Sequence, residues 1–378
     1  MPAKYGVLLV GGSRSHQEGY SSEFAEDPRC ELIGVTDEPN VPEQRKSWLR
    51  ELAEARNLPL LPDLDEALRR PDVHIASICV EFERRGPITA RCAQAGKHVY
   101  VDKPMAMSNE HAQEAVEAVR AAGVKSQMFT MARQAWAARA KRTVESGRIG
   151  ELIGMHFDLL FTKGPAGTAD LDRPRVEKYP PKRFTFIECK RELFTSCVYS
   201  VAALRWIHNR PVKRVFAQTS NYFFREHQDN DVEDFAAISL EFEGGFTATI
   251  TGGRNGWLSH PSFGPVRVFL IGNRGSQLVD ATDQRVEVSC DAPQWRPPPA
   301  NPDDPMGFWS STTRAWGGVD KFEWQTVPGG SQSDASYFVD CIEQDRESDV
   351  SLSSSAETLR ILLAAYESSA TAQPVELG

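Results

Sequence analysis

The sequence predicts an α/β protein built from two domains, and three observations lead to that class. The chain has 378 residues, more than one ordinary hydrophobic core accommodates. Its first third alternates short apolar segments with amphipathic ones, as strands and helices alternate in a parallel sheet. After Phe129 the strand-like segments alternate apolar and polar residues and are separated by glycine turns. We therefore expect a first domain at residues 1–127 and a second at 128–378, with the last helix packing back on the first.

The first domain is expected to alternate strands and helices along its whole length. Strands are predicted at residues 5–10, 31–36, 74–80 and 98–101. Helices are predicted at residues 18–26, 43–56, 63–70, 87–95 and 108–122. Ser108 is a good N-terminal cap for the last of these helices, and Gly123 a good C-terminal stop. This order predicts a parallel sheet with helices on both faces.

The second domain is expected to be an α/β unit with a largely antiparallel, open sheet. Strands are predicted at residues 155–162, 212–222, 234–241, 246–251 and 266–271. Helices are predicted at residues 135–146, 193–208 and 354–369, on one face of that sheet. Residues 291–330 are rich in Pro, Gly and Trp and are predicted to form a long surface loop.

Composition and charge exclude several classes of partner. The net charge of −9 argues against nucleic acid and against an anionic membrane surface, since both bind basic faces. No apolar run approaches the roughly 20 residues that a membrane span needs, and the first strand begins too early for a signal peptide. The seven cysteines contain no CxxC pair and the histidines no metal spacing. We expect a cytoplasmic protein without a metal site.

The start of the chain has two of the features that bind a dinucleotide in a Rossmann fold. Gly11 and Gly12 form a turn after the first strand, and Asp37 ends the second strand, where a carboxylate accepts the ribose hydroxyls. Ser13 and His16 would then lie near the pyrophosphate, at a helix N-terminus. Because no Arg follows Asp37 directly, NAD(H) is favoured over NADP. The glycine pattern is not G-x-G-x-x-G, so a plain strand–turn–helix with a solvated strand-end Asp is the alternative.

The segment from Ala95 to Met105, AGKHVYVDKPM, resembles the AGKHVxxEKP signature of the Gfo/Idh/MocA oxidoreductase family, with Asp in place of Glu. Further segments resemble that family in the same order: residues 146–151, 205–206, 210–212, 271–276 and 368–369. The resemblance covers nearly the whole chain. It implies an NAD-dependent oxidoreductase that acts on a sugar or polyol, as a homodimer or homotetramer.

By this resemblance, Lys103 would lie beside the nicotinamide and polarise the oxygen of the substrate. The cofactor would also contact Val80 and Glu81 after one strand, and Asp102 and Pro104 after the next. A strand end is a reasonable place for these residues, because ligands bind at the carboxyl edge of such sheets. The alternative for Lys103 is a surface side chain before a turn proline.

The family's D-x-G-x-H motif aligns with Thr195–Tyr199, so that Thr195 replaces the acid and Tyr199 the histidine. Some branches of the family use such a tyrosine as acid and base. We expect Tyr199 to do so if the ammonium of Lys103 lowers its pKa toward neutrality. The alternative is that Tyr199 packs in the core.

Several cations are expected near the substrate. Arg133, Lys190 and Arg191, together with Thr195, would contact a small hydroxylated substrate, and the cations suit an anionic one. The alternative is that these cations face solvent.

Two rival functions remain open at this point. One is a catalytically silent dinucleotide-binding sensor or regulator, and the other is a lyase or glycosidase that uses NAD without consuming it.

Overall fold

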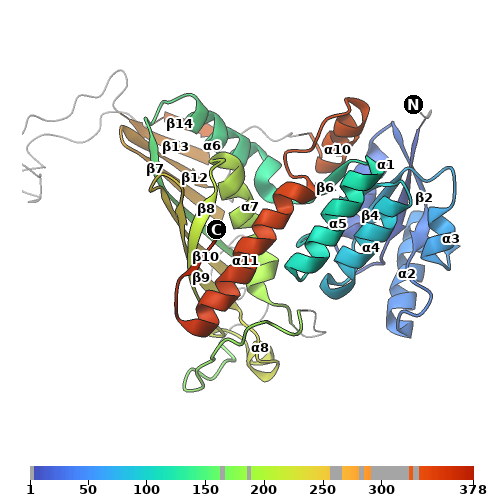
Figure 1. The fold of residues 1–378 in the computed structure, drawn as a ribbon, viewed down its shortest axis with the longest axis horizontal. Coiled ribbons are helices and arrows are strands. Elements are labelled where there is room, and N and C mark those ends of the chain that lie inside the picture. The colour runs from blue at the N-terminus through green and yellow to red at the C-terminus, as the bar shows by residue number, and fades with distance from the viewer. Residues whose placement is uncertain are drawn as a thin grey trace, which may run out of the picture.

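The computed structural model describes residues 4–161, 167–184, 189–255, 266–280, 285–290, 323–326 and 332–378. The chain forms two sheets, each covered by helices, with the long C-terminal helix running between them (Figure 1). This arrangement confirms the predicted class, a parallel Rossmann-like sheet followed by an α/β unit with a mostly antiparallel sheet.

The first sheet is parallel throughout and follows the order β3-β2-β1-β4-β5-β6. That order reverses beside β1, which creates the crevice where nucleotides bind in such folds. Its strands are β1 (Tyr5–Val10), β2 (Cys30–Thr36), β3 (Leu60–Leu61), β4 (Ile75–Ile78), β5 (His98–Val101) and β6 (Ser126–Met128). The short strands β3 and β6 were not predicted, since two or three residues are too few to show the hydrophobic pattern of a strand.

The helices of this unit largely match the prediction. They are α1 (Gln17–Glu26), α2 (Glu43–Arg56), α3 (Leu64–Leu68), α4 (Phe82–Gln94) and α5 (Asn109–Ala122). The Ser108 side chain caps α5 by accepting the His111 amide, and Gly123 ends that helix in the left-handed region. The predicted start of α4 at Pro87 was wrong. The helix begins at Phe82, and Pro87 lies inside it.

The second sheet runs β14-β13-β12-β11-β7-β10-β9-β8-β15, and every pair is antiparallel except β7 with β10. Its longer strands are β7 (Leu152–Phe161), β8 (Val212–Ser220), β9 (Phe235–Phe242), β10 (Thr247–Arg254) and β11 (Val266–Gly272). The remaining strands are β12 (Gly275–Asp280), β13 (Arg285–Cys290), β14 (Glu323–Thr326) and β15 (Val375–Glu376). Since β14 falls within residues 291–330, the prediction of a loop was wrong there; the rest of that segment lies outside the described residues.

One face of the second sheet is covered by helices. These are α6 (Ala135–Glu145), α7 (Val198–Ile207) and α11 (Leu352–Thr371), while the short α8 (Arg225–Asp229) lies at one end (Figure 1). A π-helical turn, Leu193–Cys197, leads directly into α7. The opposite face leaves large apolar side chains exposed: Ile153, Phe216, Phe269 and Ile271.

The C-terminal segment joins the two sheets. Helix α11 packs against α5 and β6 on one side and against α7 and β8 on the other. Helix α10 (Asp334–Glu343) packs on α1, and its Phe338 is buried in one cluster with Phe24 and Tyr100. Among the described helices, none is both long enough and apolar enough to cross a membrane.

Candidate active site

The carboxyl ends of β1, β4 and β5 meet at one edge of the first sheet. Gly11, directly after β1, has a φ of +105°, and a Cβ atom there would lie 2.6 Å from the carbonyl oxygen of Cys79 at the end of β4. Only glycine fits this position, because the backbone is in the left-handed region and the neighbouring chain is too close. The two strand ends therefore touch, and the following loop is directed to the N-terminus of α1.

That loop binds an anionic group through its backbone. The amide of Arg14 donates to Oε1 of Glu18 at 2.7 Å, and the amide of Ser15 donates to Oε2 at 3.2 Å. Backbone amides at a helix N-terminus are the donors that hold a dinucleotide pyrophosphate. Here the Glu18 carboxylate holds them instead. The donors therefore suit a phosphate, which has to displace Glu18 to reach them.

Ser13 turns away from this anion site. Its amide donates to the carbonyl of Trp48 at 3.0 Å, and its hydroxyl donates to Glu51 at 2.8 Å, both in α2. Gly12 is equally close to α2, since a Cβ atom there would lie 2.6 Å from the Trp48 carbonyl carbon. These contacts fix the loop against α2.

Asp37 is buried at the end of β2, as a ribose-binding carboxylate would be, but it has a cationic partner. Both of its oxygens accept hydrogen bonds from Arg84, at 2.8 and 2.9 Å. Arg84 comes from the start of α4 and also contacts Glu38 and Glu81, while Arg45 of α2 forms an ion pair with Glu81. These ion pairs join the start of α4 to the β2–α2 side of the crevice. These pairs were not predicted from the sequence.

Asp102, directly after β5, is the centre of a buried hydrogen-bond network. Its carboxylate accepts from Tyr20 at 2.7 Å and from Arg85 at 2.9 Å, and it lies 2.9 Å from Nδ1 of His16. Burial alone would raise the pKa of Asp102, but Arg85 and His16 outweigh it and hold that pKa well below its usual range. Asp102 is therefore a carboxylate that fixes its neighbours in place.

Arg85 organises the backbone on either side of Lys103. Its guanidinium donates to the carbonyl oxygens of Lys103 at 2.6 Å, Pro104 at 2.8 Å and Val80 at 2.7 Å. Three backbone acceptors and the Asp102 carboxylate make this side chain a clamp between the ends of β4 and β5. No role was predicted for Arg85 from the sequence, so its positioning role was missed.

Lys103 projects from this clamp toward the second domain. Its Nζ donates to the carbonyl oxygen of Thr195 at 2.7 Å, in the π-helical turn, and lies 4.6 Å from the centre of the Tyr199 ring. Only 3% of Lys103 is exposed. Burial lowers its pKa to about 7; Asp102 acts in the opposite direction, and Lys190 lowers the pKa further. At neutral pH Lys103 can therefore both accept and donate a proton.

The expected pKa of Tyr199 was wrong in direction. Burial raises it well above its usual value, and Asp102 and Cys79 raise it further. The reason is geometric, because the ammonium of Lys103 lies over the ring face and the phenol is almost fully buried. Within the described residues the Tyr199 hydroxyl has no hydrogen-bond partner, while the ring packs edge-on against Phe129.

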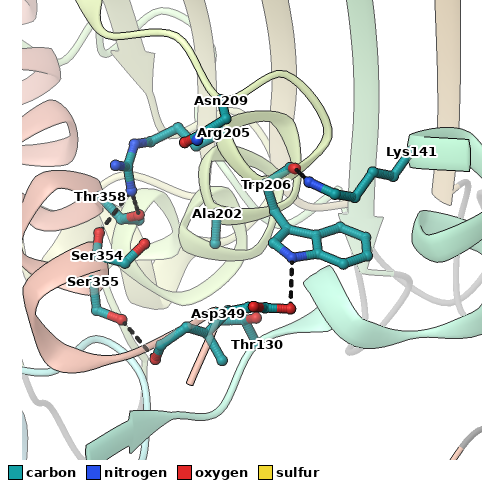
Figure 2. Close-up of a pocket in the computed structure, with 11 residues that line it drawn as sticks. Thr130, Lys141, Ala202, Arg205, Trp206, Asn209, Asp349, Ser354, Ser355 and Thr358 are labelled. Carbon is teal, nitrogen blue, oxygen red and sulfur yellow. Dashed lines mark hydrogen bonds between the residues drawn. The ribbon is translucent and has the colours of Figure 1, made fainter. Parts of the chain in front are cut away.

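Arg133 does not face Lys103. It lies over the ring of Tyr337 in α10, within 3.0 Å of the ring centre, and contacts Asp349 at 3.3 Å and Asp334 at 3.8 Å. Asp349 in turn accepts from the indole of Trp206 at 3.4 Å (Figure 2). Its charge is paired with carboxylates at the domain junction, which argues against the predicted substrate contact by Arg133.

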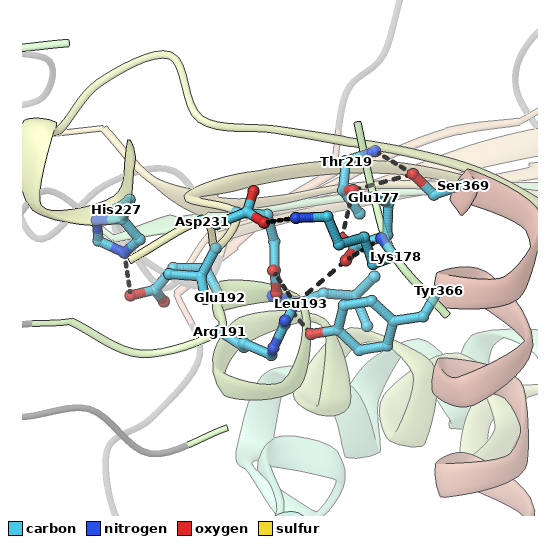
Figure 3. A network of polar contacts seen from close by, with 12 residues as sticks. Glu177, Lys178, Arg191, Glu192, Leu193, Thr219, His227, Asp231, Tyr366 and Ser369 are labelled. Atoms are coloured by element: carbon cyan, nitrogen blue, oxygen red, sulfur yellow. Dashed lines mark hydrogen bonds and ion pairs between the residues drawn. The ribbon is translucent and has the colours of Figure 1, made fainter. Parts of the chain in front are cut away.

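Arg191 is also part of the interior. It donates to Glu233 at 2.9 Å, contacts Glu177 at 3.4 Å and is 6% exposed (Figure 3). Glu233 accepts the Leu193 amide at 3.2 Å and so fixes the start of the π-helical turn that binds Lys103. Its burial and its ion pairs argue against the predicted substrate contact by Arg191. Lys190 is exposed. Thr195 binds Lys103 through its backbone carbonyl, and its hydroxyl donates to the backbone carbonyl of Arg191.

Glu192 is a second buried carboxylate close to Lys103. It is fully buried, lies 2.9 Å from Nη2 of Arg254, and is 3.7 Å from Nε2 of His227, itself 2% exposed. Burial would raise the pKa of Glu192, but His227 and Arg254 outweigh it and lower the pKa. Lys103 and Glu192 each favour the charged form of the other. No sequence signal indicated this acid, and the described part of the chain holds no group of acidic, His and Cys residues arranged for a metal.

Two family models match the chain. The model described as "Oxidoreductase family, NAD-binding Rossmann fold" matches residues 5–130, and the model of the "GFO/IDH/MocA C-terminal domain" matches residues 137–277.

Among curated proteins, two from Bacillus subtilis (strain 168) are similar. An uncharacterized oxidoreductase is 27% identical over 233 residues, which are 60% of this chain and 61% of the relative. Scyllo-inositol 2-dehydrogenase (NAD(+)) is 27% identical over 222 residues, 57% of each chain. The chain thus matches less than two thirds of the length of either relative.

Solved structures show the same fold over nearly the whole chain. Aldose-aldose oxidoreductase from Caulobacter crescentus, complexed with glycerol, has a TM-score of 0.72 at 22% identity, covering 99% of this chain and all of that one. The WlbA dehydrogenase from Bordetella pertussis, complexed with NADH and UDP-GlcNAcA, has a TM-score of 0.72 at 20% identity, covering 100% of this chain and 99% of that one.

Proposed function

Because this chain belongs to the Gfo/Idh/MocA family of NAD-binding oxidoreductases, we propose that it interconverts a secondary hydroxyl and a keto group on a sugar, a polyol or a related carbocycle. NAD, when bound, supplies the hydride acceptor for this reaction. The proton is handled by Lys103, with Tyr199 beside it.

The observation that carries the proposal is the state of Lys103. A buried lysine with a pKa of about 7 is poised for proton transfer at neutral pH, and it stands at the carboxyl edge of a dinucleotide-binding sheet. Thr195 orients the amine by accepting one of its hydrogens. In the oxidative direction the neutral amine accepts the hydroxyl proton; in the reductive direction the ammonium returns it.

We assign Tyr199 a different role from the acid and base role that was expected from the sequence. Because its pKa is raised well above the usual value, the phenol stays protonated over the physiological range. A neutral phenol with no partner among the described residues donates a hydrogen bond to the substrate oxygen. We therefore assign proton transfer to Lys103 and oxygen orientation to Tyr199.

The cofactor would be held by the edge described above. The amides of Arg14 and Ser15 would bind the pyrophosphate, as a helix N-terminus does in such folds. Asp37 would bind the adenosine ribose, as the acid at the end of the second strand does. Asp102 and His16 support the loop next to Lys103. Glu18 and Arg84 must release their partners before these groups can bind a dinucleotide.

The arrangement favours a neutral substrate over an anionic one. Of the three cations expected at the substrate, Arg133 and Arg191 are paired with carboxylates, which leaves only Lys190. Around Lys103 the buried charges include the carboxylate of Glu192, which repels an anion. A small polyhydroxylated substrate without a carboxylate or phosphate suits these charges.

One observation favours a second candidate, a dinucleotide-binding sensor without turnover. The Glu18 and Arg84 contacts occupy the groups that a dinucleotide needs, so binding is coupled to breaking them. A sensor would bind NAD(H) and form no NADH from any hydroxylated substrate. The retained Lys103, with a pKa of about 7, is the argument against it.

The experiment measures NAD binding by calorimetry and then NADH formation at 340 nm with a panel of sugars and polyols. Lys103→Met is compared with Lys213→Met, a substitution at an exposed lysine of β8. Binding in all three proteins, with turnover lost only in Lys103→Met, is the expected result. Binding without turnover in the wild type would favour the sensor, and no binding would refute both.

We further propose that two copies pair through the uncovered face of the second sheet. Ile153 of β7 is 50% exposed there, Phe216 of β8 40%, and Phe269 and Ile271 of β11 37% each. Such side chains across one sheet face are typical of subunit interfaces. Light scattering of Phe269→Glu against the wild type tests this, with loss of the dimer or tetramer expected.

A further inference from the structure

A small cavity of about 190 Å³ lies at the domain junction, away from Lys103. Its walls come from the second half of α7, the first turns of α11, Lys141 of α6, Thr130 after β6 and the segment before α11 (Figure 2). Drug-sized ligands occupy pockets of roughly 300–1,000 Å³, so this cavity suits something smaller. None of its lining residues is among those that surround Lys103.

Arg205 of α7 supplies a cation to the cavity, and the charges of Glu357 and Arg360 in α11 act on it from nearby. Its Nη1 donates to the carbonyl oxygen of Ser354 at 2.6 Å and to the hydroxyl of Thr358 at 3.1 Å, both neutral acceptors in α11. In the described part of the chain Arg205 forms no ion pair. Its Nε and Nη2 have no acceptor there. A guanidinium in this state presents a planar fork that matches an oxyanion.

Three further features make the cavity electropositive. Lys141 lines it, and its Nζ donates to the carbonyl oxygen of Trp206 at 2.7 Å, lies 4.7 Å from the centre of the Trp206 ring and is 3.7 Å from the carboxylate of Glu145. The 20-residue helix α11 directs its N-terminus there and has no acidic residue in its first turn. The hydroxyls of Thr130, Ser354 and Thr358 are additional neutral donors, whereas that of Ser355 donates to the carbonyl oxygen of Val350 at 3.4 Å.

Asp349 is the one carboxylate in the described lining, and it sets which anion fits. Its charge is already paired with Arg133 at 3.3 Å, and it accepts from Trp206 at 3.4 Å. A carboxylate has free lone pairs for a further donor but repels an anion that carries no hydrogen. Hydrogen phosphate retains an O–H at neutral pH, whereas sulfate does not.

We propose that this cavity binds inorganic phosphate, with Arg205, Lys141 and the α11 N-terminus holding the anion and Asp349 accepting its hydrogen. The site is separate from the dinucleotide crevice and does not depend on the proposed reaction. Asp349 gives it a preference for phosphate over sulfate, because only the former can donate to a carboxylate.

The test is calorimetric titration of the full chain with sodium phosphate and sodium sulfate at matched ionic strength. Arg205→Gln is expected to weaken phosphate binding about tenfold or more, because hydrogen bonds to a charged group are lost. Arg210→Gln, an exposed arginine just after α7, is the matched control and is expected to leave binding unchanged. Circular dichroism establishes that each variant is folded.

Two more variants keep the test decisive. If Arg205→Gln does not fold, Lys141→Gln takes its place, with a smaller loss of phosphate affinity. Asp349→Asn is expected to bring phosphate and sulfate to similar affinities, since an amide can donate to either anion. No phosphate binding by the wild type would overturn the proposal. Binding that survives both cation substitutions would also overturn it, by placing the anion elsewhere, as at the amides of Arg14 and Ser15.

Discussion

Replacing Glu18 with Ala is expected to tighten NAD binding, although it removes a side chain from the cofactor loop. The carboxylate now holds the amides of Arg14 and Ser15, the donors at the N-terminus of α1. A pyrophosphate must take these donors from Glu18 and must also approach its negative charge. Without Glu18 the amides are available to the ligand from the start.

The structure gives the size of this effect. Hydrogen bonds to a charged group contribute about 1.5–3 kcal/mol each where they are protected from water. Glu18 is partly exposed and its bond to Ser15 is long, so about 1–2 kcal/mol remains after solvent screening. Since about 1.4 kcal/mol corresponds to a factor of ten, the dissociation constant for NAD is expected to fall about 5- to 30-fold. Glu18→Gln is expected to lie between the wild type and Glu18→Ala.

Calorimetric titration with NAD measures the change, with Glu26→Ala at the exposed other end of α1 as the control. Thermal melting of the same proteins adds a second readout. Glu18 is the only acid in the first turn of α1, so its loss is expected to lower helix stability by about 0.3–1 kcal/mol while affinity rises. An unchanged or weaker affinity in Glu18→Ala would refute the reasoning that Glu18 competes with the pyrophosphate.

Three more predictions follow from buried charges. Lys103→Met is expected to lower turnover about 10²–10⁴-fold. In the wild type the rate of alcohol oxidation should rise with pH through about 7, where the amine of Lys103 loses its proton, and the rate of ketone reduction should fall. A rate that stays constant between pH 6 and 8 would exclude Lys103 as the base. Arg85→Met is expected to lower the free energy of unfolding by about 2–4 kcal/mol in urea denaturation, because Asp102 loses its buried cation but keeps other hydrogen bonds. A decrease of less than about 1 kcal/mol would contradict the structural role assigned to Arg85. Arg191→Met is expected to lower the free energy of unfolding by a similar amount. Adding Glu233→Leu should restore part of that stability, since removing both charges leaves neither unpaired. If the double variant is no more stable than Arg191→Met, the ion pair is not the cause.

Much of the fold was predictable because periodic burial leaves a strong local pattern. The strand Tyr5–Val10 is buried at every residue and reads as an apolar run, and α5 carries both its cap at Ser108 and its stop at Gly123. The short strands β3 and β6 were missed because their pairing is set by neighbours in the sheet. Helix α10 was missed as well; its place in the core is set by packing on α1 at the other end of the sequence.

The site was predictable only where local sequence fixes a backbone position. Lys103 follows β5 directly, so the strand itself delivers it to the carboxyl edge of the sheet. Charge pairing is different, because partners such as Asp37 and Arg84 are 47 residues apart in sequence. For the same reason Arg133 and Arg191 read as free cations, although each is paired with carboxylates in the folded chain.

The sequence alone determined the order of elements, the parallel first sheet and the place of Lys103, since these depend on hydrophobic period, turn residues and adjacency along the chain. Only the tertiary structure decided the chemistry. It buried Lys103 against Thr195 and so brought its pKa to about 7, and it raised the pKa of Tyr199 instead of lowering it. The physical reason is that a pKa depends on desolvation and on the charges within a few ångströms, and folding brings those charges together from distant parts of the chain.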